Sequence, residues 1–315
     1  MRRQQENSEI GIEVKITDSC NQYCFHCMNN DSVSNGIDLN IEFFLRKFEE
    51  WINSSQEIGV NIREVRITGG EPLLRTDAVM RIAYLCQSAS IRCGMNTNAT
   101  LLTAEVAQKL KKAGMKIIKI SLDAANEEVF KKVRGKNASL EKVHAGIRNA
   151  VNNDFYVILR FTLCEHNKDQ LISCYEAGRD MGVDRFQVKP LIPAGRGFSS
   201  KALLNQTQIF DVIKQLNTKV IDDSLPWEVL CWISEMDGGC ETKVCGSIDK
   251  VYIKTNFDII TCNYLSETLP IGNMLEDSFS GIYSNRIACN IMKSKGISVL
   301  EKCPQLAALP TLPVN

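Results

Sequence analysis

The sequence predicts an α/β protein built on a parallel sheet. Short apolar runs that are typical of strands alternate six times with longer segments of helical periodicity. Successive strand–helix units predict parallel strands joined by right-handed crossovers. The most distinctive motifs each follow directly after one of these strands. Because chemistry in parallel α/β folds gathers at the carboxyl ends of the strands, we expect the functional site there.

The elements follow one another without an internal repeat or a low-complexity linker. The predicted strands lie at 11–17, 63–68, 91–96, 116–122, 155–163 and 184–190. The predicted helices lie at 40–57, 76–88, 103–113, 126–133, 139–152 and 167–181. Gly114 and Gly182 each follow the last turn of a predicted helix, where glycine is favoured. A Pro/Gly-rich loop at 190–197 indicates where the repeating pattern ends.

Length and composition are typical of a cytoplasmic enzyme. The 315 residues are enough for one large domain and a smaller one. The 37 basic and 37 acidic residues cancel, so no global field attracts nucleic acid or an anionic membrane. The N-terminus lacks the apolar stretch of a secretory signal, and no run is long enough to span a bilayer. In such a chain the 13 cysteines are expected to be metal ligands and buried thiols.

Three cysteines lie on the loop that leaves the first predicted strand. Cys20, Cys24 and Cys27 have the spacing C-x3-C-x2-C. Three thiolates can hold three irons of a [4Fe–4S] cube and leave the fourth iron without a protein ligand, where another molecule can bind. The alternatives are a zinc knuckle, with His26 as a possible ligand, and buried apolar cysteines.

The cysteine spacing resembles the signature of the radical S-adenosylmethionine (radical SAM) enzymes. In that family the open iron chelates the amino and carboxylate groups of SAM. Gly69-Gly70-Glu71-Pro72, after the second strand, resembles the family's "GGEP" element, whose backbone and glutamate receive the methionyl ammonium. The glycines permit close backbone approach to a ligand, and the proline fixes the exit from the turn. The resemblance therefore implies that these four residues bind SAM.

A third motif follows the fourth strand and resembles the family's "SLD…RG" stretch. It comprises Ser121, Asp123 and Arg134. In the family the serine and the arginine contact the SAM carboxylate, and the strand end lies near the ribose. A guanidinium fork suits a carboxylate better than an ammonium does. The alternative is that Ser121 and Asp123 cap the helix that starts near Asn126.

Two further residues are implied as SAM neighbours. The segment 96–99 resembles the family's "TNG" segment with Ala99 in place of glycine, which makes Asn98 a neighbour of SAM. The alternative is that Asn98 is a turn residue in the left-handed conformation. His26 precedes the third cysteine, where the family usually has an aromatic ring packed near the adenine, and Phe25 lies one place earlier. An imidazole can also stack there.

The C-terminal region resembles the SPASM/twitch extension of radical SAM enzymes. Cys245 precedes a predicted hairpin at 251–254 and 259–262, and an "IGN" segment and Cys303 follow. The resemblance implies an auxiliary [4Fe–4S] cluster held by Cys245, Cys262 and Cys303. The alternatives are scattered core thiols and a zinc site, because cysteine spacing does not separate zinc from iron–sulfur.

This region departs from the family pattern at the fourth ligand. Position 306 is leucine, where a twitch domain usually has cysteine. Cys240, Cys289 or a substrate atom are the candidates for the fourth coordination position. Cys231 lies between the barrel and the extension. It is a candidate hydrogen-atom donor to a substrate radical, with a buried thiol as the alternative.

Taken over the whole chain, the resemblance implies a partial (β/α)6 TIM-type barrel with a small C-terminal α+β domain. We expect the radical SAM core at 1–200, a helical connection at 201–239 and the SPASM/twitch-like domain at 240–315. The implied cofactors are a [4Fe–4S] cluster, SAM and an auxiliary [4Fe–4S] cluster. The implied partners are a flavodoxin- or ferredoxin-type electron donor and a peptide or small-molecule substrate, with neither nucleic acid nor membrane.

The resemblance also implies the activity. In the family, SAM is cleaved reductively to a 5′-deoxyadenosyl radical, which takes a hydrogen atom from a substrate C–H bond. We expect modification of ribosomally made peptides or natural-product tailoring, with a sugar or aminocyclitol dehydrogenase or epimerase as the alternative. An alternative of another class is a non-enzymatic iron–sulfur or zinc protein, in which the "GGEP" and "SLD…RG" motifs would have no purpose.

Overall fold

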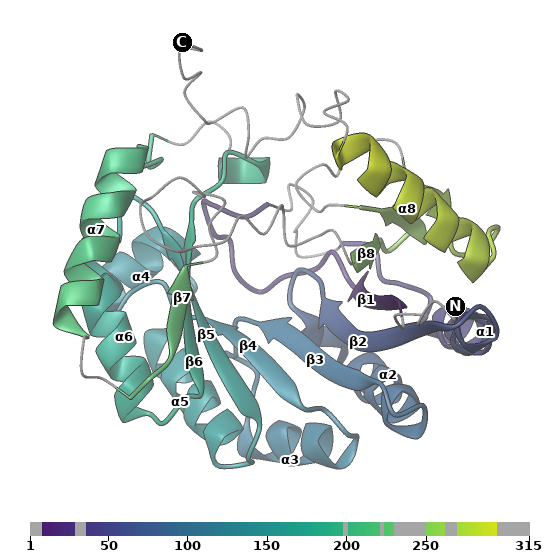
Figure 1. Ribbon diagram of the computed structural model, residues 1–315. Coiled ribbons are helices and arrows are strands. Elements are labelled where there is room, and N and C mark those ends of the chain that lie inside the picture. The colour runs from purple at the N-terminus through teal and green to yellow at the C-terminus, as the bar shows by residue number, and fades with distance from the viewer. Residues whose placement is uncertain are drawn as a thin grey trace, which may run out of the picture.

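The computed structural model describes residues 8–28, 36–197, 201–220, 224–229, 250–261 and 270–294. Its strands form one curved sheet with the order β10-β9-β8-β1-β2-β3-β4-β5-β6-β7 (Figure 1). The strands are β1 (Ser8–Lys15), β2 (Val60–Thr68), β3 (Arg92–Thr97), β4 (Ile117–Ser121), β5 (Tyr156–Leu163), β6 (Arg185–Pro190), β7 (Trp227–Val229), β8 (Lys250–Ile253), β9 (Asp258–Ile260) and β10 (Gly272–Asn273).

The helices lie between the strands in the predicted alternation. They are α1 (Ile41–Glu57), α2 (Thr76–Ser88), α3 (Ala104–Lys112), α4 (Glu127–Arg134), α5 (Leu140–Val151), α6 (Leu171–Asp180), α7 (Gln206–Lys219) and α8 (Phe279–Ser294), with short 3₁₀ turns η1 (Pro72–Arg75), η2 (Lys168–Gln170) and η3 (Gly195–Gly197). The six predicted strands and six predicted helices are confirmed to within a few residues. The sequence analysis missed β7 and β10, which are too short to show a periodic pattern.

The core of the sheet is parallel, as expected. Strands β1 to β6 pair in parallel with their neighbours, and β7 continues the parallel order beside β6. At the other edge β8 pairs in parallel with β1, and β9 turns back to pair antiparallel with β8. The predicted C-terminal hairpin is therefore confirmed, and it extends the same sheet.

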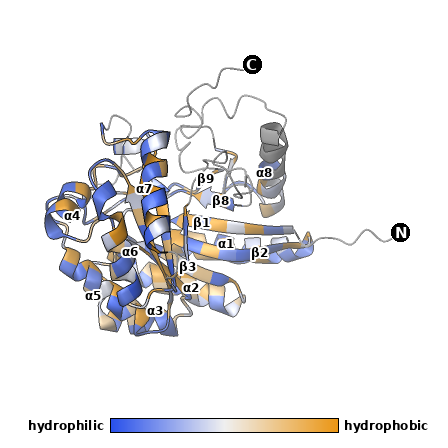
Figure 2. Cartoon of the chain, turned by 60° about the vertical axis from the view of Figure 1, so that its left-hand side comes forward, coloured by the Kyte–Doolittle hydropathy of each residue, from blue (hydrophilic) through white to orange (hydrophobic). Residues whose placement is uncertain are grey.

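The two faces of the sheet differ in burial. In β4, Ile118 and Ile120 are fully buried, whereas Lys119 and Ser121 between and after them keep accessible surface. Successive side chains of a strand point to opposite faces, so one face is apolar and covered and the other is polar and open. Helices α2, α3, α5 and α6 cover the outer face (Figure 1), and the change of hydropathy from residue to residue can be followed in Figure 2.

Besides the pairing of β8 with β1, the described C-terminal elements contact the barrel through side chains. The Trp51 ring of α1 packs edge-on against Phe279 of α8, with ring centroids 5.4 Å apart. In the β8–β9 turn, the Thr255 hydroxyl donates a hydrogen bond to Oδ2 of Asp18 (3.1 Å). Asp18 lies two residues before Cys20, so this turn reaches the first cysteine motif. Among the described helices, none is both long and apolar enough to cross a membrane.

Candidate functional site: the cysteine loop at the carboxyl end of the barrel

The three cysteines of the first motif lie on residues 18–28, which we call the cysteine loop. Cys24 is buried, and Cys20 and Cys27 are partly exposed. Burial raises the pKa of the Cys20 thiol to about 11, and it raises the pKa of Cys24 against the opposing effect of the Arg134 guanidinium. Coordination to a metal deprotonates such thiols outright.

The donor set of this loop fits an iron–sulfur cube. Cys24 and Cys27 both lie close enough to Cys20 to raise its pKa. Among the described residues, however, no three His, Cys, Asp or Glu side chains converge on a point that could hold one metal ion. Three thiols on one loop can each bind a different iron of a cube. The donor set is therefore compatible with the cube, and the zinc knuckle stays an alternative.

The two glycines of the second motif pack directly against the cysteine loop. The backbone N–H of Gly70 donates to the Thr17 carbonyl (2.8 Å), and that of Glu71 donates to the Ser19 carbonyl (2.8 Å). A Cβ added to Gly70 would lie 2.1 Å from the Ser19 oxygen, and one on Gly69 would lie 2.8 Å from the Thr17 oxygen. Packing between loops thus requires glycine here, in addition to the ligand approach inferred from the sequence.

Two other glycines bring distant loops to the same place. Gly135 follows α4 with φ +97°, and a Cβ there would lie 2.9 Å from the Tyr23 carbonyl oxygen. Gly195 has φ +57°, and its Cβ would lie 2.3 Å from the Met28 oxygen. Loops after β2, α4 and β6 therefore pack on the backbone of one short cysteine loop.

Arg196 is a site residue that the sequence analysis missed. Its Nε–H donates to the Cys24 carbonyl (3.0 Å), and its backbone N–H donates to the Cys27 carbonyl (2.9 Å). Its guanidinium lies over the Tyr23 ring, 4.1 Å from the centroid. The sequence signals for this loop are the Pro/Gly-rich composition of 190–197 and a resemblance of this stretch to the "P-x-G-r" segment that follows the sixth strand in many radical SAM enzymes.

Glu71 is a buried link between two loops. Its carboxylate accepts hydrogen bonds from the backbone N–H of Leu73 (3.0 Å), the hydroxyl of Thr97 (2.7 Å) and the backbone N–H of Asn98 (2.8 Å). Burial raises the pKa of Glu71, and these hydrogen bonds oppose the rise. The carboxylate joins the ends of β2 and β3, while Pro72 starts η1 behind it. Its contact with the SAM ammonium stays a prediction.

Asn98 is tied to the cysteine loop by its side chain. Its Nδ2–H donates to Oδ1 of Asn21 (2.8 Å), whose own amide donates to Thr100 (2.9 Å). The residue with positive φ in this turn is Ala99, at +59°. The alternative that Asn98 is the left-handed turn residue is therefore wrong, because Ala99 has that conformation instead.

Asp123 is a fully buried hub at the end of β4. Its Oδ1 accepts from the backbone N–H of Thr162 (2.6 Å), and its Oδ2 lies 2.5 Å from Nη2 of Arg134. The N-cap of α4 is Asn126, whose Oδ1 accepts from the Val129 N–H (2.9 Å). The helix-capping alternative for Asp123 is therefore wrong. Ser121 precedes this hub on the open face of β4 and does not cap α4 either.

Arg134 connects this hub to the cysteine loop. One of its N–H groups also points to the sulfur of Cys24, with an Nη1–Sγ distance of 3.7 Å. Burial lowers the pKa of Arg134, but Asp123 and Cys24 outweigh burial and raise it, so the guanidinium stays charged. Its predicted contact with the SAM carboxylate is untested, and its described partners are Asp123 and Cys24.

His26 packs beside the same hub as a neutral ring. Burial lowers the pKa of His26 to about 4, against the opposing effect of Asp123, whose Oδ2 lies 3.5 Å from Nε2. The imidazole also packs edge-on against Phe25, with centroids 5.2 Å apart. A neutral ring held here is compatible with the stacking role inferred for His26, which stays a prediction.

Several cysteines of the sequence analysis lie where the structure gives no account of them. Cys231, Cys240, Cys245, Cys262 and Cys303 lie outside the described residues, as does the side chain of Cys289 in α8. The auxiliary ligand set is therefore neither supported nor opposed by the structure. In contrast, the thiols of Cys86 and Cys93 are fully buried in the apolar core.

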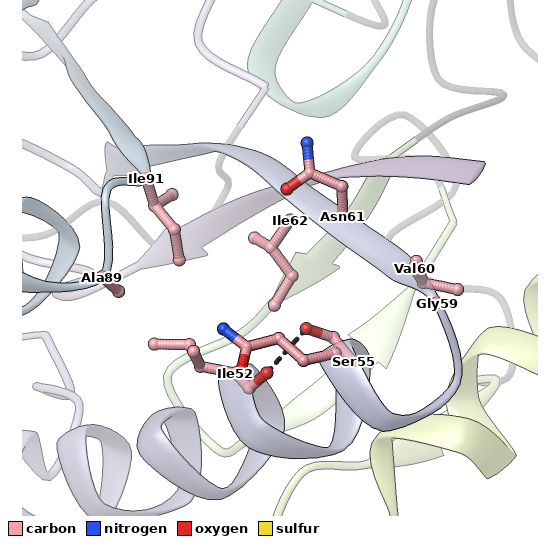
Figure 3. A pocket seen from close by; sticks show the side chains of 9 residues that line it. Ile52, Ser55, Gly59, Val60, Asn61, Ile62, Ala89 and Ile91 are labelled. Carbon is pink, nitrogen blue, oxygen red and sulfur yellow. Dashed lines mark hydrogen bonds between the residues drawn. The ribbon is translucent and has the colours of Figure 1, made fainter. Parts of the chain in front are cut away.

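A hollow of about 290 Å³ lies at the other end of the strands (Figure 3). The end of α1 and the start of β2 line it, and the Ser55 hydroxyl donates to the Ile52 carbonyl inside it (2.8 Å). Its lining residues are Ile52, Ser55, Gln56, Gly59, Val60, Asn61, Ile62, Ala89 and Ile91. None of these side chains is ionisable or a thiol, so this hollow lacks the groups needed for metal binding or acid–base chemistry.

Known proteins share sequence and fold with this chain. The profile of the Radical SAM superfamily matches residues 14–177. An AdoMet-dependent heme synthase of Methanosarcina barkeri is 32% identical over 191 residues, which are 60% of this chain and 52% of that protein. A GTP 3′,8-cyclase of Staphylococcus haemolyticus is 28% identical over 251 residues, which are 78% of this chain and 73% of that protein. The chain thus spans about half of the first relative and nearly three quarters of the second.

Solved structures share the fold. Streptococcus suis SuiB bound to the precursor peptide SuiA superposes with a TM-score of 0.73 at 16% identity, covering 95% of this chain and 70% of that one. SuiB bound to S-adenosylmethionine gives a TM-score of 0.74. The expected partial barrel with a parallel sheet is thereby confirmed. The chain belongs to the radical SAM superfamily, whose members use a [4Fe–4S] cluster and SAM.

Proposed function

We propose that this protein is an enzyme that holds a [4Fe–4S] cluster on Cys20, Cys24 and Cys27 and cleaves SAM reductively beside it. The bound cluster and SAM would supply a 5′-deoxyadenosyl radical for hydrogen-atom abstraction from a substrate C–H bond. The observation that carries the proposal is the convergence on the cysteine loop: Gly70, Gly135 and Gly195 let three separate loops pack against its backbone. These loops include the motifs that resemble SAM-binding elements.

The protein's own residues would bind and orient SAM. We assign SAM contacts to His26, Gly69, Gly70, Glu71, Pro72, Asn98, Ser121, Asp123 and Arg134. Glu71 and Asp123 are buried carboxylates held by several partners each, so the loops that carry them keep one geometry. Such pre-organisation holds the reacting groups in place and excludes water from them.

Several substrate classes are candidates for this enzyme. SuiB, which shares the fold, was solved with a precursor peptide, and this supports a peptide substrate or natural-product tailoring. The similarity to GTP 3′,8-cyclase over 251 residues supports a nucleotide as a second candidate. A sugar or aminocyclitol is a further alternative. Electrons would come from a flavodoxin- or ferredoxin-type donor.

We further propose that the C-terminal region carries an auxiliary [4Fe–4S] cluster on Cys245, Cys262 and Cys303. The hairpin β8–β9, which the sequence analysis placed between the first two of these cysteines, supports the resemblance to a SPASM/twitch extension. The corresponding division is a core at 1–200, a connection at 201–239 and an auxiliary domain at 240–315.

Anaerobic reconstitution tests the proposal. The full-length protein should bind iron and sulfide and, with dithionite, convert SAM to 5′-deoxyadenosine and methionine. The variant in which Cys20, Cys24 and Cys27 are all alanine should produce no 5′-deoxyadenosine. A Cys86→Ala variant removes a buried core thiol and should keep SAM cleavage.

The result has two clear readings. SAM cleavage by the triple variant, or a wild-type protein that binds no iron, contradicts the proposed function. Iron counting on the same triple variant tests the auxiliary site, since about four irons should remain if a second [4Fe–4S] cluster is present. Complete loss of iron from the triple variant contradicts the auxiliary cluster alone.

A further inference from the structure

The open face of the sheet is rich in cations. Along each strand, the residues of this face alternate with fully buried residues of the other face. The register of the sheet places three cross-strand pairs on it, which are Glu13 with Arg66, Asn96 with Lys119, and Ser121 with Arg160. By the same register the basic residues on it are Lys15, Arg66, Arg92, Lys119, Arg160, Arg185, Lys189 and Lys250. The acidic residues on it are Glu13, Glu64 and Glu228.

The acidic residues are engaged by only part of this set. Glu64 forms an ion pair with Arg66 and lies 3.5 Å from Arg92. Glu228 pairs with Arg185 at 3.3 Å. The side chains of Lys119 and Arg160 have neither an ion-pair nor a hydrogen-bond partner among the described residues, and Nε of Arg160 is a buried donor without an acceptor there. Two basic side chains thus face the open side of the sheet without a direct ion pair among the described residues.

These cations also lie within electrostatic range of one another. Burial, together with the nearby Arg66, Arg160 and Lys250, lowers the pKa of Lys119 to about 6, against the opposing effect of Glu64. Burial lowers the pKa of Arg160 as well, and Arg66 adds to this effect, against Glu13, Tyr252 and Asp123. Basic side chains from β2, β4, β5 and β8 therefore repel one another across this face. Such an arrangement is unfavourable unless an anion binds between them.

The unpaired cations lie next to the proposed reaction site. Lys119 lies two residues before Ser121 on β4, and Arg160 is the cross-strand partner of Ser121. Asp123 lies two residues after Ser121 and contacts both Arg134 and His26, and His26 belongs to the cysteine loop. An anion held by Lys119 and Arg160 would thus lie on the open face of β4 and β5, just before the strand ends that meet the cysteine loop.

We propose that Lys119 and Arg160, assisted by Arg66, bind a phosphate or carboxylate group of the substrate. The substrate is then an anion whose charged end is held on the open face while its reacting C–H bond faces the cysteine loop. The guanidinium of Arg160 can donate two parallel hydrogen bonds to such a group, and Lys119, which takes up a proton together with the anion, adds a point charge. This inference rests on the proposed function, which defines the reaction site.

SAM also carries a carboxylate, so the test must separate the two sources. Reconstituted full-length protein is first saturated with SAM and then titrated calorimetrically, at constant ionic strength, with inorganic pyrophosphate or with glutarate. Wild-type protein should bind at least one of these anions. Lys119→Met and Arg160→Met should each weaken that binding about tenfold or more, the scale of one charge-assisted hydrogen bond. Arg160→Lys should recover part of the loss.

The matched control is Lys112→Met, which removes an exposed lysine at the end of α3, on the covered side of the sheet. It should leave anion binding unchanged. Failure of the wild type to bind either anion, or equal weakening in the control, overturns the inference. So does a loss of SAM affinity in Lys119→Met and Arg160→Met with unchanged anion binding, because the cations would then hold the carboxylate of SAM.

Iron content, SAM cleavage and thermal unfolding are measured on every preparation. Wild-type protein that fails to cleave SAM contradicts the proposed function, whatever its anion binding. Protein that cleaves SAM but ignores both anions contradicts this inference alone. Iron is counted again after each titration, so that extraction of iron by pyrophosphate is not mistaken for binding.

Discussion

The two faces of the central strands differ in the kind of side chain that they carry. On β5 and β6 the covered face carries Phe161 and Phe186, both fully buried, and Phe186 packs edge-on against Tyr175 of α6 with centroids 5.6 Å apart. The open face of the same strands carries Arg160 and Lys189. The covered face removes apolar surface from water on folding, whereas the open face brings basic side chains close to one another.

The comparison separates stability from function within single strands. Burial of the covered face stabilises the fold in proportion to the apolar area removed from water. Clustered cations on the open face reduce stability, because each charge is partly desolvated near others of the same sign. Substitutions on the two faces should therefore change the free energy of unfolding in opposite directions. The Phe161 and Lys119 variants below test this directly, and the Asp123 and Gly70 variants between them measure what the loops at the strand ends contribute.

Phe161→Ala on the covered face should lower the free energy of unfolding by about 3–5 kcal/mol, because a fully buried ring leaves a cavity behind. Urea denaturation under anaerobic conditions measures the change. Phe161→Leu keeps most of the volume and should cost less than about 1.5 kcal/mol. Equal losses for both variants would argue against tight packing between sheet and helices.

Asp123→Ala should lower the free energy of unfolding by about 3 kcal/mol, because it leaves the buried Arg134 guanidinium without its carboxylate. The double variant Asp123→Ala/Arg134→Ala should recover part of this loss. As a control, Glu105→Ala breaks an exposed ion pair with Lys109 and should leave the free energy of unfolding nearly unchanged. A double variant as unstable as the sum of the singles would show that the two side chains do not interact.

Gly70→Ala should lower the free energy of unfolding by about 1–3 kcal/mol and reduce iron retention, because the new Cβ overlaps the Ser19 oxygen of the cysteine loop. Gly281→Ala in α8 meets only the Ser278 hydroxyl at 3.3 Å and serves as the control. Iron per protein after desalting is the sensitive measurement. Full retention in Gly70→Ala would mean that the cysteine loop can move away at little cost.

Lys119→Met on the open face should leave the protein equally stable or more stable at neutral pH. The pKa of Lys119 is lowered from 10.5 to about 6 in the folded state. Between these values the unfolded chain binds a proton that the folded chain does not, so wild-type stability falls as pH falls from about 10 toward 6, by at most ~1.4 kcal/mol per pH unit. The variant lacks this dependence.

Denaturation of both proteins at pH 7 and pH 9 checks the sign. The difference in free energy of unfolding, variant minus wild type, should be larger at pH 7. A difference that does not change with pH, or one that grows at pH 9, would mean that Lys119 is not held among other cations.

Much of the fold was predictable because it depends on local patterns. Alternation of apolar strands and amphipathic helices placed β1 to β6 and α1 to α6, and the hairpin β8–β9 followed from its turn residues. The strands β7 and β10 are too short to show a periodic pattern, and they are defined by their pairing with β6 and β9. The sequence therefore did not predict them. The pairing of β8 with β1 joins segments more than two hundred residues apart, and no local signal encodes it.

The site was predicted in its residue types and only partly in its contacts. The sequence identified the cysteine spacing and the motifs after β2, β3 and β4. It offered capping as one role for Asp123, whereas the fold pairs Asp123 with Arg134 and assigns the cap to Asn126. It did not point to Arg196, because only the folded chain brings the loop after β6 onto the cysteine loop.

The sequence by itself determined the parallel α/β architecture, the carboxyl-end location of the site and the thiol donor set, since each is encoded in residues that are neighbours along the chain. Only the tertiary structure decided that the motif glycines pack loop against loop and that Lys119, Arg160 and Arg66 meet on one face. Close approach and charge repulsion depend on distances between remote segments, and those distances exist only once the sheet has closed around them.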